Sequence, residues 1–166
     1  MNYSDIANGL IFQKMDIKND SFTNRLICQK KIYLLQSLGT NIGYSYNWYK
    51  RGPYSPDLTE YVYENLSELR ELNLSDYSLS DESIHNEEIV EKLAEDKPDG
   101  LSLEWWYELL ASLAYISDNK TSWHVVDKSS LFGELISHKP RFNIQLSDYA
   151  FNCLEKNNFP GIKALV

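Results

Sequence analysis

The chain has 166 residues, of which 43% are hydrophobic and 24% are charged, and its formal net charge is −8. This composition is typical of a globular protein, and the negative charge argues against general binding of nucleic acid, whose phosphates would be repelled. No apolar run approaches the length of a membrane span, and the first residues lack the basic segment that opens a secretory signal. We therefore expect a cytoplasmic protein without a membrane partner.

Hydrophobic positions three and four residues apart predict about seven helices, separated by turn-forming residues. Ser4 and Thr23 are suited to cap the first two helices, and Ser55 followed by Pro56 is a strong start for the third. We expect the last residues, from 159 on, to fray or to pack loosely. The predicted helices cover residues 5–15, 24–38, 56–72, 84–95, 103–118, 122–137 and 147–156.

Between the second and third predicted helices, large aromatic residues recur at every second position. Tyr44, Tyr46 and Trp48 alternate with small polar residues, which predicts a short strand within residues 42–49. The expected fold is therefore mainly helical with one small strand or hairpin element, and it is compatible with a winged-helix-like core. We expect one helical domain over residues 1–166. Lobes at 1–72 and 101–157, joined by the acidic segment 73–100, are the alternative division.

The charge is unevenly distributed along the chain. Residues 60–118 carry 16 acidic and three basic side chains, a net charge of −13, whereas the rest of the chain has a net charge of +5. Glutamates recur at helical spacing in two of the predicted helices. Such rows are typical of solvated helix faces, and they would also steer a basic partner toward the protein.

The loop WYKRGPYSPD, residues 48–57, has a functional and a structural interpretation. In the first, Lys50 and Arg51 lie just before a helix start that attracts anions, and Trp48 and Tyr54 stack on a partner. In the second, Gly52 and the two prolines only shape the turn that leads into the helix. Both interpretations remain open at this point.

Two aromatic residues of the predicted helix 103–118 fall outside its apolar stripe. Trp106 and Leu110 fit the apolar stripe of helix 103–118, whereas Trp105 and Tyr107 do not. We therefore expect Trp105 or Tyr107 to anchor a partner or a second subunit.

The sequence offers no catalytic constellation. It contains neither a G-x-x-x-x-G-K-[ST] phosphate loop nor a G-x-S-x-G nucleophile elbow. None of the three histidines has a His or Cys three or four positions away, and Cys28 and Cys153 are far apart in sequence. We expect no metal site, no cofactor and no enzymatic activity.

Two stretches resemble a small prokaryotic family, the YwgA-like proteins. They are KKIYLLQSLG with IGYSYNWYKRGPYSPDLTE, and ELLASLAYIS with LFGELISHKPRFNIQLSDYAFNCLEK, and together they span residues 25–156. A more distant resemblance is to the Panacea or SocA-like antitoxin domain, which also has a helix, an aromatic strand and a Gly-Pro turn opening the next helix. The chain departs from that domain in its acidic middle and lacks a toxin-binding signature.

The resemblance implies a protein-binding role, because antitoxins of the second group neutralise toxins by contact. We expect a non-enzymatic, antitoxin-like, regulatory or phage-defence accessory protein whose partner is a toxin, a nuclease or another defence component. The expected contact residues are Trp48, Lys50, Arg51, Tyr54, Trp105 and Tyr107. The alternative is a winged-helix-like regulator that binds nucleic acid through Lys30, Lys31, Lys50 and Arg51.

Overall fold

The computed structural model describes residues 2–166 and is mainly helical, with one small antiparallel hairpin. The mainly helical fold predicted from the sequence is therefore confirmed. The elements are α1 (Tyr3–Lys14), α2 (Phe22–Ser37), β1 (Asn47–Tyr49), β2 (Gly52–Tyr54), α3 (Pro56–Glu71), α4 (Asp81–Lys92), the short 3-10 helix η1 (Leu93–Asp96), α5 (Leu103–Asp118), α6 (Lys128–His138), α7 (Ile144–Lys156) and α8 (Pro160–Lys163).

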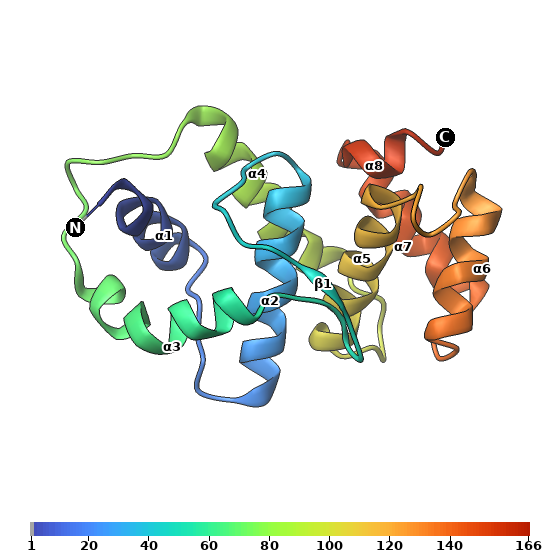
Figure 1. Cartoon of the computed structure of the whole chain (residues 1–166), viewed down its shortest axis with the longest axis horizontal. Helices are drawn as coiled ribbons and strands as arrows, with labels where there is room; N and C mark the ends of the chain where they lie inside the picture. Colours follow the sequence, from blue (N-terminus) through green and yellow to red (C-terminus); the bar gives the residue numbers. More distant parts are fainter. Residues whose placement is uncertain (1) are drawn as a thin grey trace.

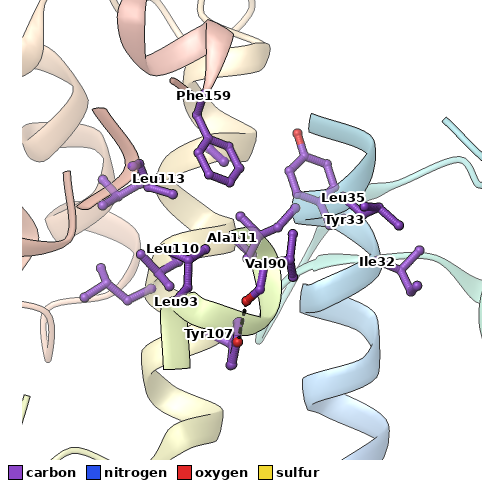
Figure 2. Packing of buried hydrophobic residues seen from close by; sticks show 14 of the residues in the cluster. Ile32, Tyr33, Leu35, Val90, Leu93, Tyr107, Leu110, Ala111, Leu113 and Phe159 are labelled. Carbon is purple, nitrogen blue, oxygen red and sulfur yellow. Dashed lines mark hydrogen bonds between the residues drawn. The ribbon is translucent and has the colours of Figure 1, made fainter. Parts of the chain in front are cut away.

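Helices α2 and α5 form the centre of the molecule. Figure 1 shows α1 and α3 toward one end, near the N-terminus, and α6 at the other end, with α2 and α5 between them. The hydrophobic core is one continuous cluster, and Figure 2 shows part of it, with Tyr33 of α2 directed toward α5 and Ile32 and Leu35 on the opposite side of α2. Each fully buried Leu or Ile side chain of this kind contributes about 1.5–3 kcal/mol of burial free energy.

Local sequence signals set several helix starts. The Ser55 hydroxyl accepts the Leu58 N–H, with Pro56 as the first residue of α3, as the sequence predicts. The first two helices begin earlier than predicted, because Asn2 and Ser21 provide the capping oxygens in place of Ser4 and Thr23. The earlier start of α2 leaves Phe22 as its exposed first residue.

The strand is shorter than the alternating pattern indicates. Residues 42–46 keep the alternation of half-buried and exposed side chains, but a ladder forms only where β2 supplies a partner. The side chains of the alternating tyrosines instead bond to the helices, with the Tyr44 hydroxyl donating to Asn8 Oδ1 (2.6 Å) and the Tyr46 hydroxyl donating to the Gln29 carbonyl (2.8 Å).

Two predictions for the C-terminal part are wrong. The helix expected over 122–137 begins only at Lys128, where Asp127 and Ser130 form a capping box, and residues 119–126 are mostly turns. The tail expected to pack loosely forms α8, with Phe159 and Ile162 fully buried. Among residues 2–166, no helix combines the length and the apolar character needed to cross a membrane.

Candidate binding surface at the hairpin tip

The hairpin lies directly on α5. Its register pairs Asn47 with Tyr54 and Tyr49 with Gly52, so Lys50 and Arg51 form the turn. Gly52 has φ = +91°, and a Cβ atom added there would lie 2.8 Å from the Ser112 hydroxyl of α5. Only glycine satisfies both the positive φ and this close approach.

Helix α2 holds the other side of the hairpin. The Gln29 side chain donates to the Ser55 carbonyl (3.0 Å) and accepts the Ser55 N–H (2.9 Å), so one amide satisfies two backbone groups. The buried Lys30 ammonium donates to the Pro53 carbonyl over 2.6 Å. The hairpin is therefore fixed to two helices of the core before any partner arrives.

A buried carboxylate gathers cations around the turn. Glu108 of α5 is fully buried, and its Oε1 lies 2.5 Å from Arg51 Nε. Its Oε2 contacts Arg141 Nη2 and lies 3.1 Å from the buried Lys139 Nζ. Lys139 also donates to the Lys50 carbonyl (2.8 Å), so the same cluster fixes the backbone of the turn. We call Lys30, Arg51, Glu108, Lys139 and Arg141 the Glu108 cluster.

The Glu108 cluster holds more positive than negative charge. Burial lowers the pKa of Lys30 to about 7, against the opposing attraction of Glu108. Burial also lowers the pKa of Lys139, again opposed by Glu108. Arg51 Nη2 and Ser112 Oγ are buried polar atoms without a hydrogen-bond partner in residues 2–166. A single carboxylate thus leaves the cationic side of the cluster incompletely compensated.

Exposed aromatic rings lie around the two arginines of the cluster. Phe22, Tyr49 and Trp105 are 58%, 43% and 40% exposed. The guanidinium carbon of Arg51 lies 5.9 Å from the Phe22 ring centroid, and that of Arg141 lies 4.8 Å from the Trp105 ring centroid, so both make cation–π contacts. The hairpin-tip surface is defined here as Phe22, Tyr49, Arg51, Tyr54, Trp105 and Arg141.

The hairpin-tip surface combines residues from distant parts of the chain. Thr23 donates to Glu104 Oε2 (3.3 Å), which joins the start of α2 to the start of α5 and places Phe22 and Trp105 on neighbouring helix ends. The rings of Tyr49 and Tyr54 meet edge to face, with 5.2 Å between their centroids. In Figure 1 the hairpin extends to the edge of the molecule beside the start of α5.

Several predicted contact residues lie elsewhere than expected. Tyr107 is fully buried and donates its hydroxyl to the Val90 carbonyl (2.7 Å; Figure 2), so in this fold it offers no surface to a partner. Trp48 is half-buried against Trp123, with 4.9 Å between the ring centroids. Arg51 and Tyr54 are half-buried, whereas Lys50 and Trp105 are exposed.

The four lysines and arginines of the nucleic-acid alternative do not form one face. Lys30 is buried beneath the hairpin. Lys31 is mostly buried and pairs with Glu91 Oε1 at 2.9 Å. Only Lys50 and Arg51 of the four are at the hairpin turn with exposed surface.

Sequence reasoning missed Phe22, Tyr49, Glu108, Lys139 and Arg141. One signal for Glu108 was present, since it is a charged residue between Trp106-Tyr107 and Leu109-Leu110 in the most apolar helix. A charge at such a position is buried only with partners. The basic residues in Lys139-Pro140-Arg141 supply two of those partners.

A separate cavity of about 320 Å³ lies between α2 and α3. Cys28, Leu58 and Val62 are among its lining residues, together with Lys18 and Arg25. Within residues 2–166, no group of three or more His, Cys, Asp or Glu side chains is placed to hold a metal ion.

Comparison of the chain with family models, with curated proteins and with solved structures gives no match.

Proposed function

We propose that this chain is a non-enzymatic protein-binding module that contacts its partner through the hairpin-tip surface. The observation that carries the proposal is the exposure of Phe22, Tyr49 and Trp105 around Arg51 and Arg141. Tyr, Trp, Phe and Arg are the residue types enriched in protein–protein interfaces, and Trp, Tyr and Arg dominate their binding energy.

The rigid support of the surface favours the same function. Gln29 fixes the backbone of Ser55, Lys30 binds the Pro53 carbonyl, and Glu108 fixes the Arg51 side chain. Binding by a preorganised surface loses little conformational entropy, so more of the contact energy appears as affinity.

The resemblance to YwgA-like proteins and to the Panacea or SocA-like antitoxin domain supports a regulatory, antitoxin-like or phage-defence accessory role. In the antitoxin group the domain acts by contact, which is the mode of action that an aromatic and arginine surface on a fixed hairpin serves. We therefore propose a toxin, a nuclease or another defence component as the class of partner, within the cytoplasm.

Nucleic-acid binding by a winged-helix-like core remains the alternative, and the observation that favours it is the exposure of Lys50 at the tip of a hairpin. It predicts a mobility shift with duplex DNA that weakens steeply as salt is raised. The burial of Lys30 and the pairing of Lys31 with Glu91 count against it.

Capture experiments with two matched double variants test the protein-binding function. Phe22→Ala with Trp105→Ala removes two exposed rings from the hairpin-tip surface, and Tyr3→Ala with Tyr77→Ala removes two exposed rings elsewhere. We expect the immobilised wild-type protein and the Tyr3/Tyr77 variant to capture the same partner from an extract, identified by mass spectrometry. The Phe22/Trp105 variant should lose it. Equal capture by all three proteins, or the absence of any specific partner, would contradict the proposal.

A further inference from the structure

Two arginines are held side by side by one carboxylate. Glu108 uses Oε1 for Arg51 and Oε2 for Arg141, so both guanidinium groups converge on a single side chain. The Arg51 and Arg141 side chains are 28% and 34% exposed, so part of each side chain is in contact with solvent. Because each arginine has five N–H donors, a guanidinium that is bound to Glu108 retains donors for a second anion.

The charge balance of the Glu108 cluster favours an added anion. Three cationic side chains, Arg51, Lys139 and Arg141, contact one carboxylate, and the buried Lys30 adds a fraction of a fourth positive charge near pH 7. A partly buried group of like charges is destabilised by repulsion, and an anion bound against it offsets that repulsion. Any ligand that binds the folded state in this way also raises the stability of the protein.

We propose that the hairpin-tip surface recognises an acidic segment of a partner protein. The carboxylates of that segment lie against Arg51 and Arg141, and Phe22 and Trp105 cover the neighbouring parts of the segment. This inference rests on the proposed protein-binding function and specifies the chemistry of the partner. Bidentate pairing of guanidinium with carboxylate gives such a site its geometric selectivity.

Charge complementarity favours a short acidic segment over nucleic acid. The chain has a net charge of −8, so a long polyanion that extends beyond the two arginines is repelled. Glu104 lies beside Trp105 in the sequence, and Asp57 is exposed at the start of α3. The rows of glutamate on α3 and α4 are suited to attract a basic partner, whereas the hairpin-tip surface carries the opposite local charge.

The direct test is an NMR titration of the wild-type protein with a short Glu-rich peptide. A peptide with Gln in place of every Glu is the matched control. We expect the Glu-rich peptide to shift the Trp105 indole N–H signal and the Nε–H signals of Arg51 and Arg141. The indole of Trp106, buried and bonded to the Leu93 carbonyl, should not move. Affinity should fall as salt is raised, because partly exposed charges are screened.

Two variants sharpen the titration. Arg141→Gln should weaken binding of the Glu-rich peptide about tenfold, equivalent to about 1.4 kcal/mol. Arg141→Lys keeps the charge but loses the two-pronged geometry and should be intermediate. Circular dichroism tests whether each variant is folded. If Arg141→Gln is unfolded, the titration of the wild-type protein with the two peptides decides the question.

Three results would overturn the inference: no shift at Trp105, the same shifts with the Gln peptide, or tighter binding of a single-stranded oligonucleotide at the same signals. The last result would assign the surface to nucleic acid. If the peptide fails while the Phe22/Trp105 variant still loses its captured partner, the acidic segment is wrong and the protein-binding function stands. If capture is unaffected, the function itself is wrong.

Discussion

Helix α5 carries two carboxylates with different surroundings, the exposed Asp118 and the fully buried Glu108. Asp118, at the end of the helix, accepts neutral hydroxyl groups, from Tyr33 at 2.6 Å and Ser37 at 2.7 Å. Glu108, near its start, is surrounded by cations. Partial desolvation of its carboxyl group raises the pKa of Asp118, and the hydrogen bonds from Tyr33 and Ser37 oppose this rise.

The difference separates a structural contact from a candidate binding site. The Asp118 site joins α2 to α5 with neutral donors, and no excess positive charge gathers there. Helix α8 packs against one side of it, since a Cβ added to Gly161 would collide with the Asp118 carboxylate. The Glu108 cluster leaves excess positive charge beside exposed aromatic rings. Excess positive charge next to exposed aromatic rings serves recognition, whereas a carboxylate bound by hydroxyl donors of a neighbouring helix serves packing.

The largest expected effect on the free energy of unfolding comes from neutralising Glu108, compared with neutralising Asp118. Glu108→Gln leaves three cations against a neutral side chain, which should lower the free energy of unfolding by about 3–5 kcal/mol. Asp118→Asn keeps an oxygen that accepts from Tyr33 or Ser37 and should cost about 1–2 kcal/mol. Urea denaturation of both variants measures the difference. Equal losses would show that the cations around Glu108 contribute nothing specific.

The next largest effect concerns the contact between the hairpin and α5. Gly52→Ala combines a positive φ with a collision at the Ser112 hydroxyl, and we expect it to cost about 2–4 kcal/mol. Gly43→Ala is the matched control, because Gly43 has φ = +92° and open space around its Cα. It should cost about 1 kcal/mol from the backbone alone. Thermal unfolding measures the stability of both variants. Similar losses of stability in the two would argue against a close approach of Gly52 to Ser112.

A smaller effect depends on pH. Because the pKa of Lys30 is about 7 in the folded protein and 10.5 for a solvated lysine, the unfolded chain binds one more proton between these pH values. The wild type should therefore gain stability as pH rises from about 7 toward 10, by about 1–3 kcal/mol, and show no further Lys30-dependent change below pH 7. Lys30→Met removes this dependence. The difference between the two proteins in urea denaturation at several pH values isolates Lys30 from other titrating groups, and a constant difference would contradict its neutralisation.

The smallest expected effect on stability belongs to the exposed rings. Phe22→Ala with Trp105→Ala should change the free energy of unfolding by less than about 1 kcal/mol, because both side chains are largely solvated. The same double variant should lose partner capture. A large loss of stability in chemical denaturation would mean that these rings support the fold and that the capture result needs another explanation.

Local signals predicted the helices well where capping and periodicity decide the structure. Helix α3 begins at Pro56 because Ser55 caps it, and both features are visible in the sequence. The start of α6 was missed because Trp123 and Val125 extend the apolar pattern of the helix toward its N-terminus. Both residues pack against the core, but they lie in the non-helical segment before α6. Tertiary packing, not local preference, determined the conformation of those residues.

The candidate site was only partly predictable, because its defining contacts join distant residues. The turn at Lys50 and Arg51 was identified, but Glu108 lies 57 positions from Arg51 and 33 from Arg141. Tyr107 was misplaced because α5 is covered on nearly every side, so a residue outside the apolar stripe is still buried. One-sided periodicity identifies exposed residues only on helices that have a solvent face.

Site-specific photo-cross-linking tests the central claim most directly. A photoreactive phenylalanine analogue replaces Trp105 in one protein and Tyr77, an exposed aromatic residue outside the hairpin-tip surface, in another. The account predicts that the probe at position 105 forms a covalent adduct with a protein partner, and that the adducted peptide is rich in Asp and Glu. A partner that cross-links equally from position 77, or nucleic acid as the only adduct at position 105, would contradict it.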